Sequence, residues 1–265
     1  MLLMIRFVPV ALAVVLLAMG AGRSESLPPG FVMDGQGLVA SVTDGDTLRL
    51  ADGREIRLVG IQAPKLPLGR TNYPAWPLGP EAKAALEQLV LKRTLSLYFG
   101  GAREDRNGRV LAQLVRDDGL WLQAEMLRKG LARVYTFPDN RTGISALLTA
   151  EILARNARRG IWAESFYVIR NPENLDGLTD TYQLVEGRVR KVSPSKRAIY
   201  LNFGEDWHSD FTLKIDIKDL ALFVKAGFDP RSLEGQTLRV RGWLREAGGP
   251  LIQLTHPEQI ERLDK

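Results

Sequence analysis

The sequence contains no cysteine and only two histidines among its 265 residues. Without cysteine the chain can form no disulfide, so each domain must rely on its own hydrophobic core. A lipid-modified N-terminus is excluded as well, because no cysteine follows the apolar residues near Met1. The histidines, His208 and His256, lie far apart and lack the paired spacing of zinc ligands. We expect both to lie on the surface and not in a zinc site.

No apolar run is long enough to predict a membrane span. Residues 7–19 are apolar, follow Arg6 and precede the small residues 20–22. As a helix this run would reach about 20 Å, whereas a hydrocarbon core measures roughly 30 Å. The pattern predicts a cleaved export signal over residues 1–22. We therefore expect an exported protein, periplasmic or secreted, with no stable membrane span after cleavage.

The overall composition is that of an ordinary globular protein, with 45% hydrophobic and 25% charged residues. The length suffices for two modest domains. A net charge of +5 is compatible with a polyanionic partner but does not require one.

The first half predicts short strands and packed helices, in a chain that is mainly β with helices (α+β). Tight turns at Asp44-Gly45 and Asp52-Gly53 separate the first strands. The predicted strands are 38–42, 47–50, 55–59, 94–99 and 110–115, and the predicted helices are 80–91, 121–129 and 144–159. Five short strands with packed helices predict an OB-like barrel over residues 35–163.

The second half predicts another β-rich unit. Residues 164–181 lack periodicity and contain Asn171-Pro172 and Asp176-Gly177, which indicates a linker. Strands are then predicted at 184–192, 198–203, 211–217, 237–244 and 251–254, with a short helix at 219–226. This order of elements predicts a second OB-like domain over residues 182–262.

Two acids and two arginines fall at the ends of the first domain's strands. They belong to Asp44-Gly45-Asp46-Thr47, to the segment from Arg57 to Lys65, and to the loop from Asp105 to Arg109. Taken singly, the acids are typical of turns and Arg57 of a solvent-facing strand position. Taken together, they could hold a phosphodiester beside a metal ion.

Five collinear motifs resemble the staphylococcal nuclease (thermonuclease-like) family. The resemblance runs from about residue 35 to 162 and leaves the C-terminal half outside. The motifs are DGDT at 44–47, RLVGI at 57–61, DRNGR at 105–109, GLARV at 130–134 and RGIW at 159–162.

The resemblance implies a calcium-dependent phosphodiesterase on an OB fold that cuts DNA and RNA with little sequence preference. It implies that Arg57 and Arg109 grip the phosphate, and we expect Arg106 of the same loop to bind it as well. It also implies that Asp46 is the first calcium ligand, with Asp44 beside it. A nucleotide-stacking aromatic falls on or near Tyr135, with Phe137 as a second candidate.

The chain departs from the family where the chemistry is most demanding. The second calcium aspartate falls on Gln62, the carbonyl donor on Ala63, and the catalytic glutamate on Lys65. Calcium affinity follows the number of charged oxygens, so these replacements predict impaired Ca²⁺ binding. Loss of a positioned base removes roughly 10²–10⁴ in rate.

We therefore expect a protein that binds nucleic acid or another phosphorylated ligand with little or no hydrolysis. In this hypothesis Lys65 pairs with Asp46, replaces the metal's charge, and forms a phosphate clamp with Arg57 and Arg109. One alternative is an active metal-dependent nuclease with a modified site, rescued by Glu104 or Asp105. Another is a cell-envelope module that contacts proteins through its second OB-like domain.

Overall fold

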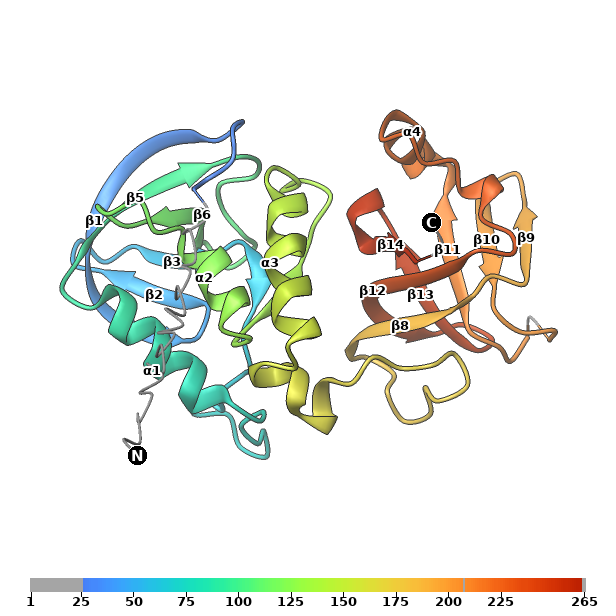
Figure 1. The fold of residues 1–265 in the computed structure, drawn as a ribbon, viewed down its shortest axis with the longest axis horizontal. Helices are drawn as coiled ribbons and strands as arrows, with labels where there is room; N and C mark the ends of the chain where they lie inside the picture. Colours follow the sequence, from blue (N-terminus) through green and yellow to red (C-terminus); the bar gives the residue numbers. More distant parts are fainter. Residues whose placement is uncertain (1–25, 207, 264–265) are drawn as a thin grey trace, which may run out of the picture.

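The computed structural model describes residues 26–206 and 208–263, so the predicted export signal lies outside the described residues. Two β-rich domains lie side by side, and helix α3 (Ile144–Asn156) runs along the side of the first that faces the second (Figure 1). Each domain has its own core of buried apolar side chains. None of the helices in the described ranges is long and apolar enough to cross a membrane.

The first domain is a closed five-stranded barrel in the order β1-β2-β3-β6-β5. Neighbouring strands are antiparallel except β3 and β6, which run parallel. Apolar residues such as Leu48 and Ile56 fill its interior. The predicted OB-like barrel is therefore confirmed. Its strands are β1 (Val32–Asp44), β2 (Thr47–Leu50), β3 (Glu55–Leu58), β5 (Thr94–Phe99) and β6 (Val110–Val115).

Three helices and a small second sheet complete this domain. The helices are α1 (Gly79–Val90), α2 (Leu122–Arg128) and α3. The small sheet pairs β4 (Gly60–Gln62) with β7 (Arg133–Tyr135). Gly60 has a φ of +90°, and a Cβ there would lie 2.7 Å from Leu147 Cδ1 of α3. Only glycine therefore lets β4 pass this close to the helix.

The second domain is one curved seven-stranded sheet that repeats the topology of the first. Its path is β14-β12-β13-β11-β10-β9, and β8 pairs with β12. β8 and β9 follow each other closely in the sequence, and they pair with β12 and β10, as the single strand β1 pairs with β5 and β2 in the first domain. β11 and β13 run parallel, as β3 and β6 do. The elements are β8 (Tyr182–Arg188), β9 (Lys191–Pro194), β10 (Ala198–Asn202), β11 (Thr212–Asp216), α4 (Ile217–Lys225), β12 (Thr237–Glu246), β13 (Pro250–Leu254) and β14 (Ile260–Arg262).

The segment predicted as a linker, residues 164–181, is attached to both domains. The Tyr167 hydroxyl donates to the Pro77 carbonyl at 2.9 Å, whereas Leu175 is buried in the second core. The backbone of Arg170 pairs with β8. The 3-10 helices of the chain are η1 (Gly160–Ala163), η2 (Ser165–Tyr167), η3 (Pro230–Ser232) and η4 (Pro257–Gln259).

A buried ion-pair network joins the domains. The guanidinium of Arg241 on β12 lies 2.8 Å from Glu151 of α3 and 2.6 Å from Glu261 of β14. Arg155 of α3 pairs with the same two glutamates at 3.3 and 2.7 Å. Burial disfavours the charged form of Arg241, but these carboxylates outweigh it and raise its pKa. Removing one member would leave a buried charge unpaired, so the network holds the domains in one arrangement.

The prediction that His256 lies on the surface is wrong. This side chain is 1% exposed, and its Nε2 lies 2.7 Å from Thr136 Oγ1 of the first domain. Its Nδ1 lies 2.9 Å from Thr255 Oγ1. Burial lowers the pKa of His256 to about 4, with Glu258 opposing and Arg141 adding to the effect. His208 is exposed, as expected.

We expect acid to weaken the folded state through His256. Its pKa is about 4 when folded and 6.5 when unfolded, so between these values the unfolded chain binds the extra proton. The free energy of unfolding should fall by up to about 1.4 kcal/mol per pH unit as pH drops from 6.5 to 4. Denaturant titrations across this range, compared with His256→Gln, measure this contribution. Identical pH slopes for both proteins would contradict it.

Candidate functional site

Asp46 lies in the tight turn between β1 and β2, where its carboxylate is fully buried. Gly45 lets this turn approach α1, because a Cβ there would lie 2.7 Å from the Cβ atoms of Ala63 and Ala82. The close approach allows the Ala63 N–H to donate to Asp46 Oδ2 at 2.7 Å. The Thr47 hydroxyl donates to Oδ1 at 3.1 Å. The backbone thus places one buried negative charge at a defined point.

Two cations of the chain itself balance this charge. Lys65 Nζ lies 3.0 and 2.8 Å from the two carboxylate oxygens of Asp46, and Arg57 Nη1 lies 3.2 Å from Oδ1. Lys65 Nζ also lies 3.6 Å from Asp44 Oδ2. The structure therefore contains the ion pair on which the sequence-based hypothesis depends.

The two aspartates of the turn differ in their ionisation. Burial opposes the charged form of Asp46, but Arg57 and Lys65 outweigh it and hold the pKa of Asp46 well below its ordinary value. Burial and the charge of Asp46 raise the pKa of Asp44. Asp44 accepts the backbone N–H of Asp46 at 3.2 Å. Asp44 therefore stabilises the turn through this hydrogen bond, and Asp46 is the aspartate of the turn whose ionised form is favoured.

The residues at the calcium positions do not fit Ca²⁺ as they are arranged. Gln62 Oε1 accepts two hydrogen bonds from Arg133, at 3.0 and 2.7 Å, so this oxygen faces a guanidinium. Lys65 covers both oxygens of Asp46. Within residues 26–206 and 208–263 no three acidic, histidine or cysteine side chains form a metal-binding group. A cation that prefers six to eight oxygens would have to displace Lys65.

Arg57 connects this charge cluster to an adjacent cavity. Its Nη1 donates to the carbonyls of Asp46 and Leu58 at 3.1 and 2.8 Å, and its Nη2 donates to the Ile61 carbonyl at 2.7 Å. These bonds fix the plane of the guanidinium. Its Nε–H and one Nη2–H have no recorded partner among the described residues, and the side chain lines the cavity. Arg57 is therefore held in one orientation at the cavity wall.

The loop before β6 carries the other two predicted arginines. Asp105 Oδ1 accepts the backbone N–H groups of Asn107 and Arg109 at 2.8 and 3.1 Å, and Oδ2 accepts Arg109 Nε at 2.8 Å. Burial opposes ionisation of Asp105, but these bonds lower its pKa. Asp105 is thus engaged in holding the loop, which argues against the alternative in which it replaces the missing base. Arg106 lies exposed beside it.

A cavity of about 640 Å³ gathers the predicted phosphate-binding residues. Arg57, Arg106, Arg109 and Tyr135 all line it, together with Phe137. The rings of Tyr135 and Phe137 pack edge to face with centres 4.9 Å apart. Guanidinium groups and aromatic rings on one wall suit a ligand with phosphates and planar bases.

Lys65 does not line this cavity, and neither does Asp46. The Lys65 ammonium forms an ion pair with the Asp46 carboxylate. Asp46 in turn pairs with Arg57, which lines the cavity. The expected clamp of Arg57, Arg109 and Lys65 is therefore brought together only in part. Two arginines share the cavity, whereas Lys65 acts on Arg57 through Asp46.

The second domain contributes two cavity residues that the sequence did not predict, Trp243 and Arg245 at the end of β12. Trp243 Nε1–H donates to the Tyr135 hydroxyl at 2.8 Å, a contact between residues 108 positions apart. No local pattern marks such a pair, so only the arrangement of the two domains reveals it.

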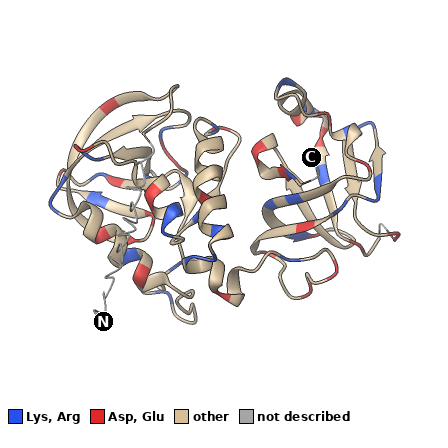
Figure 2. Cartoon of the chain, viewed as in Figure 1, with Lys and Arg blue, Asp and Glu red and all other residues tan. Residues whose placement is uncertain are grey.

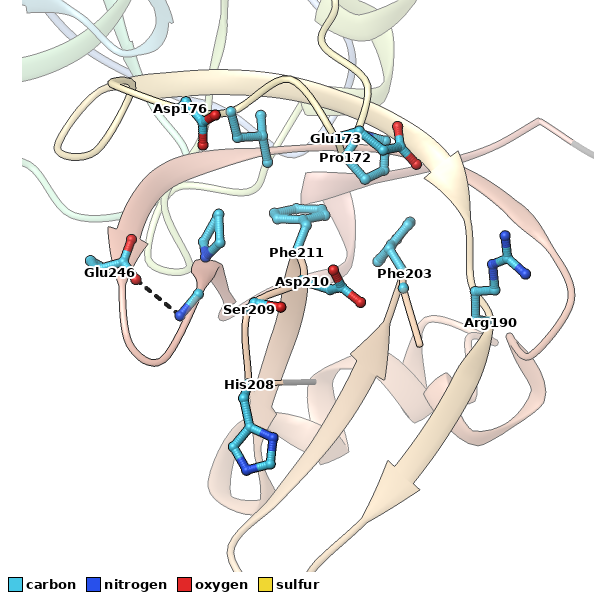
Figure 3. Close-up of a pocket in the computed structure, with 14 residues that line it drawn as sticks. Pro172, Glu173, Asp176, Arg190, Phe203, His208, Ser209, Asp210, Phe211 and Glu246 are labelled. Atoms are coloured by element: carbon cyan, nitrogen blue, oxygen red, sulfur yellow. Dashed lines mark hydrogen bonds between the residues drawn. The ribbon is translucent and has the colours of Figure 1, made fainter. Parts of the chain in front are cut away.

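A pocket in the second domain has mainly acidic side chains, unlike the arginine-lined cavity around Arg57. This pocket of about 580 Å³ is lined by four carboxylate residues and, among the described residues, by Arg190 as its only arginine or lysine. Figure 3 shows the carboxylates of Glu173, Asp176, Asp210 and Glu246 around it. The cavity around Arg57 has four arginines against three carboxylates. Elsewhere basic and acidic residues are interspersed over both domains (Figure 2). A polyanion is therefore better matched by the cavity between the domains.

Comparisons with known proteins agree with the resemblance read from the motifs. The model of the family described as staphylococcal nuclease homologue matches residues 55–164. An uncharacterized endonuclease of Escherichia coli is 33% identical over 141 residues, which are 52% of this chain and 83% of that protein. The endonuclease YncB of Bacillus subtilis is 33% identical over 130 residues, 47% of this chain and 60% of that protein.

A plant protein gives a shorter match. The probable staphylococcal-like nuclease CAN1 of Oryza sativa is 38% identical over 116 residues, 44% of this chain and 31% of that protein. The coverage of the Escherichia coli relative and the family match define a nuclease-like protein. The chain belongs to the staphylococcal nuclease homologue family, and its C-terminal half lies outside the matched domain.

We expect Lys65→Met to destabilise the first domain. The substitution leaves the buried Asp46 carboxylate with Arg57 as its only cation, so the free energy of unfolding should fall by about 1–3 kcal/mol at pH 7. Lys83→Met is a matched control, because Lys83 pairs with Glu87 at 3.9 Å on the surface. The control should change stability by less than about 0.5 kcal/mol. Denaturant unfolding that ranks the two variants equally would contradict the dependence of Asp46 on Lys65.

Proposed function

We propose that the first domain binds nucleic acid by its phosphates in the cavity lined by Arg57, Arg106 and Arg109, with little or no hydrolysis. One observation carries this proposal: Lys65 Nζ lies within 3.0 Å of both oxygens of Asp46. Asp46 is the residue that the family resemblance assigns to calcium. Its charge is already balanced by the chain, so the substrate phosphate would meet arginines but no metal.

The chemistry of position 65 supports the same conclusion. A protonated ammonium has no lone pair with which to accept a proton from water, so Lys65 cannot act as the base in that state. Arg57 and Arg109 can still orient a phosphate, because guanidinium groups form paired hydrogen bonds to phosphate oxygens. Binding and hydrolysis are therefore separable in this site.

Restoring the two family residues tests whether Lys65 and Gln62 are the cause. We expect Gln62→Asp/Lys65→Glu to gain Ca²⁺-dependent thermal stabilisation and at least about 10²-fold in cleavage of single-stranded DNA. Stabilisation should reach about 2.7 kcal/mol at a calcium concentration 100 times the dissociation constant. Gln62→Asp alone is the control, since it keeps Lys65 on Asp46 and should gain neither property.

A cleavage assay on the unmodified protein could contradict this proposal. Brisk Ca²⁺-dependent cleavage that Arg57→Ala abolishes would rule out a binding protein and favour an active nuclease. Two observations support that second function: the relatives are named as endonucleases, and Glu104 lines the cavity without an ion pair to any described residue. In that case Glu104→Gln should remove the activity.

Binding itself is measurable through its salt dependence. Each phosphate contact with single-stranded DNA contributes about 0.7 to the slope of log affinity against log salt concentration. We expect Arg106→Ala to lower this slope by about that amount. Arg49→Ala removes another exposed charge, on β2 and outside the cavity, and should leave the slope unchanged. Equal effects of both variants would indicate attraction by net charge alone.

A further inference from the structure

One face of β12 is turned toward the first domain. Side chains along a strand alternate between its two faces, and Leu238 and Leu244 belong to the core of the second domain. Arg241, Trp243 and Arg245 therefore share the opposite face. Exposure rises along this row: Arg241 is 1% exposed, Trp243 is 40% exposed, and the Arg245 side chain is 56% exposed.

The buried end of this row is an anchor. Arg241 forms the ion pair with Glu151 of the first domain, two residues before Trp243. Trp243 then donates its indole N–H to the Tyr135 hydroxyl at 2.8 Å. The ring of Tyr182 lies 4.8 Å from that of Tyr135 and 6.3 Å from that of Trp243. The indole is thus fixed beside Tyr135 before any ligand arrives, which reduces the entropy lost on binding.

The exposed end of the row has the chemistry of a nucleotide subsite. The Arg245 guanidinium lies 5.8 Å from the centre of the Trp243 ring, and both side chains line the cavity that contains Arg57 and Arg109. Proteins that hold single strands combine a basic groove with aromatic rings on which bases stack. Arg245 pairs with Asp180, an exposed contact that a phosphate can replace at little cost.

We propose that Trp243 and Arg245 form a subsite for a second nucleotide, next to the one whose phosphate Arg57 and Arg109 hold. This inference rests on the proposed function. The base of the second nucleotide stacks on Trp243, and its phosphate contacts Arg245. Because stacking requires an unpaired base, the occupant is single-stranded DNA or RNA of at least two nucleotides.

Two probes of different length separate the subsites. Thymidine 3′,5′-bisphosphate has one base and can fill only one subsite, whereas a labelled single-stranded thymidine octanucleotide is long enough for both. We expect Trp243→Ala to weaken octanucleotide binding by about 5- to 150-fold and to change bisphosphate binding less than about 2-fold. Trp243→Phe keeps a stacking ring and should lose less than the alanine variant. Thermal unfolding of each variant verifies that the folded state is retained.

Arginine variants give an independent readout. Arg245→Ala should lower the salt slope for the octanucleotide by about 0.7 and leave that for the bisphosphate unchanged. Arg231→Ala is the matched control, because Arg231 is similarly exposed and pairs with Asp229 at 3.5 Å outside the cavity. The control should have no effect. A uridine octanucleotide repeats both measurements for RNA, and a DNA duplex of equal length should bind without dependence on Trp243.

The outcomes distinguish the two levels of the proposal. If the unmodified protein binds neither probe, the proposed function fails, and this subsite fails with it. If it binds both probes, and Trp243→Ala and Arg245→Ala bind the octanucleotide as tightly as the unmodified protein, only the subsite is overturned. Loss of bisphosphate binding in Trp243→Ala would also overturn it, because Trp243 would then act through Tyr135 in the first subsite.

Discussion

The buried carboxylate of Asp46 is the constraint on which the site depends. A negative charge without water must be balanced nearby, either by a bound cation or by side chains of the chain. Here Lys65 and Arg57 balance it. Arg57, one of these two cations, also lines the cavity, and the neighbouring Gln62 accepts from Arg133. The charge at position 65 thus acts directly on the two aspartates of the β1–β2 turn, and Arg57 is the residue that links this turn to the cavity.

The second buried charge cluster determines how the domains sit. Arg241 inserts between Glu151 and Glu261, and each of these charges would be costly to leave alone. The resulting contact turns one face of β12 toward the first domain and brings Trp243 to Tyr135. A strand of a domain outside the family match therefore becomes part of the wall of the cavity that contains Arg57 and Arg109.

The sequence predicted what local patterns encode. The Asp44-Gly45 turn, the alternating strands and the Lys65–Asp46 pair all follow from residues close together or from aligned motifs. Strand β4 was missed, because the prolines that follow Gln62 predict a loop and its partner β7 lies 71 positions away. The burial of His256 and the contact of Trp243 depend on how two domains pack. Neither the periodicity nor the residue spacing within one domain predicts how the two domains pack.

Replacing a metal by a lysine need not collapse the phosphate cavity, because Arg57 is held mainly by backbone carbonyls. Three of its hydrogen bonds go to Asp46, Leu58 and Ile61 oxygens, whose positions follow from β3, β4 and the turn before β2. Arg109 is likewise oriented within its own loop by Asp105. Most of the bonds that orient Arg57 and Arg109 therefore do not involve Lys65. The proposed loss of hydrolysis therefore requires no change in the arginines that line the cavity, and the second domain adds Trp243 and Arg245 to the same cavity.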